Sequence, residues 1–149
     1  MTRINAGMPV RWLSNEHLIA EHREIKRIPN AVKNRKVNWN IPIPDKFTLG
    51  KGHVRFFYDK IKYLERRYKK IYAECKKRGI NVQYYGEAFN LYQPDSFFKE
   101  KYGCDCKNDS YELIQKTYKD WTPTQEAFEL IKQRIKDNNE KSAAKRNKL

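Results

Sequence analysis

"VRFFYDKIKYLERRYKKIYAECKKRG", residues 54–79, decides the fold, because no other part of the chain has such regular spacing. Its apolar residues recur at alternating steps of three and four: Val54, Phe57, Ile61, Leu64, Tyr68, Ile71 and Cys75. This spacing places the side chains on one stripe of an α-helix, and such a stripe is normally core. Gly79 stands where a glycine commonly ends a helix, so the sequence predicts that the helix stops there.

Basic side chains occupy the positions between these apolar residues: Lys60, Lys62, Arg66, Arg67, Lys69 and Lys70. Residues of this kind usually form a solvated face, and the same face could lie against a polyanion. The 149-residue chain has a net charge of +14, and its first 79 residues hold 20 Lys and Arg against 7 Asp and Glu. Residues 80–149 hold 12 Lys and Arg against 11 Asp and Glu. The basic half is therefore the predicted surface for a polyanion.

A second helix is predicted before this stretch. Ser14 can cap its start, with Leu13 and Leu18 as a hydrophobic staple around the cap. We expect the helix to end near Ile28, because Pro29 disfavours helical backbone in the residue before it.

A third helix is predicted near the end of the chain, where "TPTQ" at 122–125 reads as a capping box. In this interpretation Thr122 is the N-cap, Pro123 the first helical residue and Gln125 the reciprocal partner. The expected buried face consists of Phe128, Ile131 and Ile135.

These elements predict an all-α fold: a single compact domain of three helices joined by long loops. Residues 1–137 form the expected domain, and the basic segment 138–149 is expected to be a disordered tail. Residues 80–120 are rich in aromatic side chains and are expected to be irregular. Most of these rings are expected to pack the loop onto the helices, and a few could stack on bases.

The cysteines and the hydropathy indicate a compartment. No apolar run approaches the roughly 18 to 20 residues that span a membrane, and the first residues lack the apolar core of a signal peptide. Three cysteines, an odd number, fit a reducing compartment, so a cytoplasmic protein is expected. Cys104 and Cys106 form a lone C-x-C without a second pair at zinc-finger spacing, so reduced thiols are the expected state and no metal site is predicted.

Thr2 is a candidate nucleophile through its backbone. A small second residue permits removal of Met1, which would expose the amine of Thr2. A terminal amine has a pKa of about 7.7 to 8.0 against about 10.4 for lysine, so far more of it is uncharged near neutral pH. A disordered chain end is the ordinary alternative.

Glu24 is a candidate acid within the basic run "HREIKR", residues 22–27. On one helix, Arg23 and Arg27 lie four residues apart, and Glu24 lies three before Arg27, so the three side chains can border one site. The alternative is a surface ion pair, which contributes only a few tenths of a kcal/mol.

Five segments together resemble a known family: "MTRIN" at 1–5, "HLIAEHREIKR" at 17–27, "LGKGHVRFFYDK" at 49–60, "AECKKRG" at 73–79 and "TPTQEAFELIKQRI" at 122–135. They are similar, in the same order, to the phage endonuclease V family of pyrimidine-dimer DNA glycosylases with abasic-site lyase activity. This resemblance implies an all-α domain of three helices and a DNA repair enzyme.

The resemblance also implies roles for individual residues. The freed amine of Thr2 would attack C1′ of the damaged nucleotide and form an imine, and Glu24 would stabilise the cationic sugar and assist proton removal. The residues that match the family's DNA-contacting positions or lie near its site are Arg3, His17, Arg23, Arg27 and Arg134. For His17 the alternative is a capping role at the helix start, and for Arg134 it is a solvated edge charge.

The implied partner is double-stranded DNA that contains pyrimidine dimers or abasic sites, bound by a monomer without metal or cofactor. A rival interpretation is a basic duplex-binding protein that kept the scaffold without the chemistry. A metal-dependent nuclease is the other alternative, and the sequence lacks the clustered Asp, Glu and His residues that it would need.

Overall fold

The computed structural model of the chain describes residues 2–92, 100 and 110–147, with side chains described through residue 138. All regular structure in these ranges is helical, which confirms the predicted all-α class. The elements are η1 Val10–Trp12, α1 Asn15–Glu24, α2 Arg27–Lys33, α3 His53–Phe56, α4 Ile61–Lys77, η2 Gly86–Phe89, α6 Ser110–Thr117 and α7 Gln125–Asn147. Cys104 and Cys106 lie outside the described residues.

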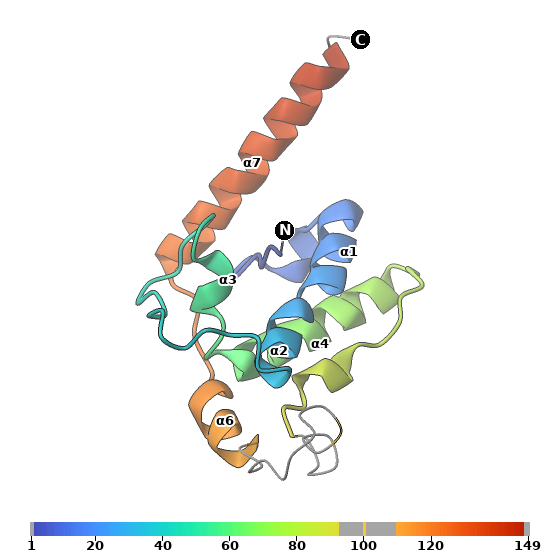
Figure 1. Cartoon of the computed structure of the whole chain (residues 1–149). Helices are drawn as coiled ribbons and strands as arrows, with labels where there is room; N and C mark the ends of the chain where they lie inside the picture. Colours follow the sequence, from blue (N-terminus) through green and yellow to red (C-terminus); the bar gives the residue numbers. More distant parts are fainter. Residues whose placement is uncertain (1, 93–99, 101–109, 148–149) are drawn as a thin grey trace.

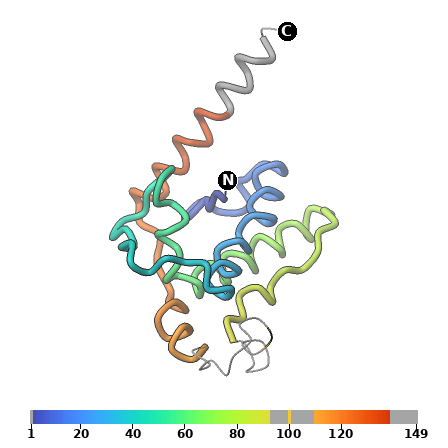
Figure 2. The backbone as a smooth tube through the Cα atoms, viewed as in Figure 1, coloured from blue at the N-terminus to red at the C-terminus, as the bar shows by residue number. Residues whose placement is uncertain are grey.

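Helix α4 lies at the centre of the arrangement, and α1, η1 and η2 pack against it. The predicted apolar stripe from Val54 to Cys75, of which α4 carries the last five residues, is core, since six of its seven residues are buried and Val54 is partly buried. Helix α7 projects away from this body, and the N-terminal end of the chain lies between α1 and α7 in the views of Figures 1 and 2.

The first predicted helix is divided into α1 and α2, and its predicted end near Ile28 is wrong. Proline lacks an N–H group, so Pro29 cannot donate to the carbonyl of Ile25, and its ring would crowd that carbonyl. The N–H of Ile28 instead donates to Ile25 O at 3.4 Å. Pro29 itself lies in the first turn of α2, where a missing N–H group costs nothing.

The second predicted helix is also divided, because a turn at residues 57–60 separates α3 from α4. Its predicted end is confirmed. Gly79 has a φ of +75°, and the N–H of Ile80 donates to Cys75 O at 2.9 Å. The N–H of Gly79 donates to Lys76 O at 3.0 Å, which completes a Schellman motif.

The third predicted helix is α7, with a different cap from the one expected. The hydroxyl of Thr124, rather than that of Thr122, accepts the N–H of Ala127 at 3.1 Å. Of the predicted buried face, Ile131 is fully buried and Phe128 and Ile135 pack partly buried against the core. Helix α7 extends to Asn147, through residues that the sequence assigned to a tail, and the domain boundary at residue 137 stays a prediction.

Helix α6 was not expected, because the sequence around it reads as irregular. Leu113 and Thr117, one turn apart, are its buried residues together with Ser110. Among the described residues, no helix combines the length and the apolar character needed to cross a bilayer.

Candidate active site

The first residues of the chain are held in place by their backbone. The N–H of Arg3 donates to Oε2 of Glu24 at 3.2 Å, and the N–H of Ile4 donates to Nε2 of His53 at 2.9 Å. Ile4, Asn5 and Ala6 are buried. The segment that carries Thr2 is therefore anchored in the core, and the expectation of a disordered chain end does not describe it.

His53 holds this segment as a neutral ring. Its Nδ1–H donates to Thr48 O at 2.8 Å, which leaves Nε2 free to accept from Ile4. Burial lowers the pKa of His53 from its usual 6.5, and the bond to Thr48 opposes that effect only in part. A neutral imidazole is the form that can accept an N–H bond, so burial and the bonding pattern agree.

The backbone bond to Glu24 fixes the position of the neighbouring Thr2 nitrogen. The backbone nitrogens of consecutive residues are at most about 4 Å apart, so the Thr2 nitrogen lies within about 7 Å of a Glu24 carboxylate oxygen, given the 3.2 Å hydrogen bond from Arg3. The Glu24 side chain is 12% exposed, and Arg23 Nη2 lies 3.9 Å from its other oxygen. The carboxylate thus faces both the backbone and an exposed cation.

Thr2 lines a pocket of about 420 Å³. Its lining comprises Thr2, Arg3, Leu49, Gly50, Gly52, His53, Val54, Arg55, Tyr58 and Arg134. Three of these side chains are arginines, so the pocket favours an anionic ligand. Arg55 is partly fixed, because its Nη1 donates to Asn38 O at 3.0 Å.

Arg134 extends from α7 into the lining of this pocket, and its guanidinium group is hydrogen-bonded to Asn5. Its Nη2 donates to Oδ1 of Asn5 at 2.6 Å, and the amide nitrogen of Asn5 donates to Oε1 of Glu21 at 2.7 Å. Burial, followed by the nearby Arg3, lowers the pKa of Arg134 from its usual value. The interpretation of Arg134 as a solvated edge charge does not fit these contacts.

Glu21 completes the set through Arg67 of α4. The Nε of Arg67 donates to one carboxylate oxygen of Glu21, and its Nη2 donates to the other at 3.0 Å. Glu21 is 1% exposed and Arg67 6%. Burial lowers the pKa of Arg67, but the carboxylate of Glu21 outweighs this and raises it overall. The prediction of a solvated Arg67 is therefore wrong.

The structure thus joins four side chains in one buried polar chain, Arg67, Glu21, Asn5 and Arg134, which leads from α4 to the pocket at Thr2. The sequence analysis missed Glu21 and Asn5. A signal was available for Glu21, because it lies between Leu18 and Ile25 at positions where helical spacing calls for an apolar residue. Such a residue either breaks the stripe or is paired in the core.

The other predicted DNA-binding residues, Arg23, Arg27 and His17, do not line the pocket at Thr2. Arg23 and Arg27 are exposed, and the break between α1 and α2 lies between them. His17 occupies the first turn of α1, where its N–H donates to Ser14 Oγ at 3.2 Å and its Nδ1 lies 2.9 Å from the same oxygen. The capping role of His17 is therefore observed, and contacts of these three residues with DNA stay predictions.

The described residues contain no group of three or more His, Cys, Asp or Glu side chains placed to hold a metal ion. The arrangement offers instead a carboxylate, a backbone segment aimed at it and a set of arginines. This combination suits a reaction in which positive charge develops on the substrate beside the carboxylate, while the arginines bind phosphate groups of that substrate.

Comparison with known families supports this picture of a DNA-processing domain. The family model described as pyrimidine dimer DNA glycosylase matches residues 1–85, which include Thr2, Arg3, Glu24 and the Glu21–Arg67 pair. The match covers more than half of the chain. The chain belongs to the pyrimidine dimer DNA glycosylase family, as its sequence resemblance indicated.

Proposed function

We propose that this protein excises pyrimidine dimers and then cleaves the strand as an abasic-site lyase, with the amine of Thr2 as nucleophile after removal of Met1. The observation that carries the proposal is the bond from the Arg3 N–H to Glu24 at 3.2 Å. It ties the carboxylate to the residue next to the amine, so both groups can reach one sugar.

The reaction proceeds in two steps. The neutral amine attacks C1′ of the 5′ nucleotide of the dimer, and the glycosidic bond of that nucleotide breaks. Its base leaves the sugar with the bonding electrons and takes up a proton, and it stays joined to the 3′ base through the cyclobutane ring. Loss of the proton from nitrogen and opening of the sugar ring give an imine. The positive charge that develops on the sugar is stabilised by the Glu24 carboxylate.

Strand cleavage follows from the imine. A base removes the C2′ proton, the electrons shift toward the imine, and the 3′ phosphate leaves by β-elimination. Glu24 is the available base, because its side chain is partly exposed and its carboxylate accepts the N–H of Arg3, next to Thr2. Water then hydrolyses the imine and restores the amine. These steps use no metal or cofactor.

The arginines act on the DNA backbone. Arg3 and Arg134 line the pocket beside Thr2, and Arg23 lies next to Glu24. Bidentate contacts from such side chains fix the register of the damaged strand. Arg27 and His17 extend the same basic region along α1 and α2. The nucleotide reaches the pocket by leaving the helical stack.

Borohydride reduction tests the chemistry. With an abasic-site or dimer-containing duplex, the protein is expected to give a covalent adduct of the mass of protein plus DNA strand, also in the presence of EDTA. A protein with a blocked N-terminus gives none. Absence of an adduct with the free N-terminus would favour the non-catalytic binding protein.

The variant Glu24→Gln separates chemistry from binding. It is expected to bind the duplex with similar affinity and to lose strand incision, because an amide stabilises the cationic sugar poorly and does not accept the C2′ proton. The measurement is single-turnover incision with affinity by fluorescence anisotropy. Incision at the wild-type rate would remove Glu24 from the mechanism.

A further inference from the structure

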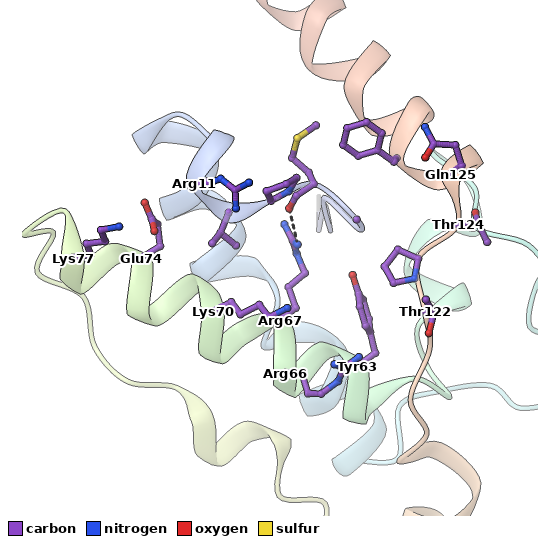
Figure 3. A pocket seen from close by; sticks show the side chains of 16 residues that line it. Arg11, Tyr63, Arg66, Arg67, Lys70, Glu74, Lys77, Thr122, Thr124 and Gln125 are labelled. Atoms are coloured by element: carbon purple, nitrogen blue, oxygen red, sulfur yellow. Dashed lines mark hydrogen bonds between the residues drawn. The ribbon is translucent and has the colours of Figure 1, made fainter.

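A second and larger pocket lies between η1, α4 and the start of α7 (Figure 3). Its volume is about 910 Å³, and it shares no lining residue with the pocket at Thr2. Along the chain, the buried segment Ile4–Ala6 lies between Thr2 and Arg3, which line one pocket, and residues 7–11, which line the other. The mechanism proposed above makes no use of this second pocket.

The charge of this pocket is strongly positive. Its lining contains one acid, Glu74, which Arg78 neutralises through a bond of 2.9 Å between Nε and Oε1. Arg67 is likewise neutralised by Glu21, and its Nη1 donates to Met8 O, as the dashed line in Figure 3 shows. Neither pair leaves net charge for a ligand.

Three cations of the lining remain available, namely Arg11, Lys70 and Lys77. None of them has an ion-pair partner within 4 Å among the described residues. Arg66, also in the lining, is shared with the exposed Asp120. The uncompensated charges come from two elements, since Arg11 belongs to η1 and both lysines to α4.

The charged residues of α4 lie on the face of that helix that lines the pocket. Arg66, Lys70, Glu74 and Lys77 are four, four and three residues apart, which places them on one face of α4. The start of α7 borders the same space with Thr124 and Gln125, and a helix start adds partial positive charge. Charge complementarity therefore selects an anion.

We propose that this pocket is a second DNA-binding site, which holds backbone phosphates of the duplex beyond the nucleotide that reacts at Thr2. The identity of the polyanion as DNA rests on the proposed function. The placement of the charges around the pocket favours a string of phosphates over one free ion. Each nitrogen of the buried Arg67 guanidinium already donates to a protein oxygen, and the available cations are long side chains that come from two elements, η1 and α4.

The test compares two triple variants that remove the same charge. The first is Arg11→Gln with Lys70→Gln and Lys77→Gln. The matched control is Lys36→Gln with Lys46→Gln and Lys119→Gln, three exposed lysines that line neither pocket. Binding of each to an undamaged 30-base-pair duplex is measured by anisotropy between 50 and 200 mM salt.

The pocket variant is expected to bind more weakly, with a salt slope smaller by about 0.9 for each phosphate that the protein no longer neutralises. The control variant is expected to change little. Equal weakening in both variants would show that net charge alone acts, and unchanged binding by the pocket variant would show that the pocket binds nothing. Either result would overturn the proposal.

Two further arms complete the test. Inorganic phosphate, at constant ionic strength, is expected not to displace the duplex; displacement from the wild type but not from the pocket variant would assign the pocket to a single phosphate ion and contradict the proposal. Borohydride trapping at saturating protein is expected to be unchanged in the pocket variant. Because undamaged duplex involves no chemistry, failure of trapping in the wild type would count against the proposed function alone.

Discussion

Glu21 and Glu24 stand three residues apart in α1, and the fold gives them different surroundings. Glu21 is enclosed and bound by Arg67 and Asn5, whereas Glu24 is 12% exposed and accepts the backbone N–H of Arg3. A carboxylate whose oxygens are already occupied by a guanidinium is a poor base. The structural acid and the candidate catalytic acid are thus separated by one helical turn.

The Glu21–Arg67 pair should matter strongly for stability. Glu21→Leu leaves Arg67 buried without its partner, and such a loss costs about 3 to 5 kcal/mol. Adding Arg67→Met is expected to restore part of that loss, which urea unfolding would measure. The exposed Lys69 is the control, since Lys69→Gln should cost less than about 1 kcal/mol. A double variant less stable than Glu21→Leu would contradict the role assigned to the pair.

Two buried histidines should make stability depend on pH. Burial lowers the pKa values of His22 and His53 below 6.5. Their stabilising contribution is therefore complete above about pH 6.5. It is lost as the pH falls toward the lower folded-state values, because the unfolded chain takes up protons first. Each histidine contributes at most about 1.4 kcal/mol per pH unit in that window.

Urea unfolding between pH 7.5 and 5.5 measures this effect. His22 lies among Tyr68, Tyr72 and Tyr85, so His22→Phe keeps an aromatic ring in its place and removes one titrating group. Its slope with pH should be smaller than that of the wild type. Stability that stays constant or rises on acidification would show that the rings are not held neutral.

At the scale of elements, sequence spacing located the helices that contain α1, α4 and α7, but it located neither their breaks nor α6. The stripe from Ile61 to Cys75 and the stop at Gly79 were predictable, because both depend on local periodicity and backbone conformation. The break before α2 was misplaced by a few residues, since proline disturbs the carbonyl four positions earlier as well as its direct neighbour.

Long-range pairing explains most of what spacing missed. Arg67 looks like one of several solvated cations until Glu21, 46 residues away, is placed opposite it. The link from Asn5 to Arg134 spans 129 residues. The resemblance brought Arg134 into the prediction and gave Glu24, already a candidate from its basic surroundings, a catalytic role, whereas nothing local in the sequence distinguishes Asn5 from a surface residue.

The stop at Gly79 offers a test of the local rules. An added Cβ at this position meets no atom within 4 Å, so Gly79→Ala should cost only the backbone penalty of its φ of +75°, about 1 kcal/mol. Gly79→Asn is expected to cost less, because asparagine tolerates this region better. Chemical denaturation of the two variants checks the order, and equal stability of all three proteins would refute it.

At the scale of the whole molecule, the positive charge is divided between two pockets that share no lining residue. The pocket at Thr2 gathers arginines around the backbone segment, while α4 carries lysines on the face that borders the larger pocket. Residues 138–149 add four Lys and Arg against one Glu. A duplex held at several of these places would bind with a steep dependence on salt.

Truncation after residue 137 tests the predicted domain boundary. Ile131 and Ile135, which pack α7 on the core, lie before the cut, so the thermal midpoint and trapping at saturating protein should be unchanged. Affinity for duplex should fall, since the removed segment is basic. Truncation after Lys132 is the control, because it removes Arg134 and Ile135 and is expected to abolish trapping. Unfolding of the longer form would place the boundary later.

The burial of Ile4, Asn5 and Ala6 has a consequence for how such an enzyme can change. A reactive amine on the main chain is not repositioned by exchanging one amino acid for another, since every residue type carries its backbone nitrogen at the same place in the chain. It moves only when the chain ahead of Ile4 is lengthened or shortened, and one inserted residue shifts it by about 3.5 Å. Purification tags therefore belong at the other terminus, where they leave this reach undisturbed.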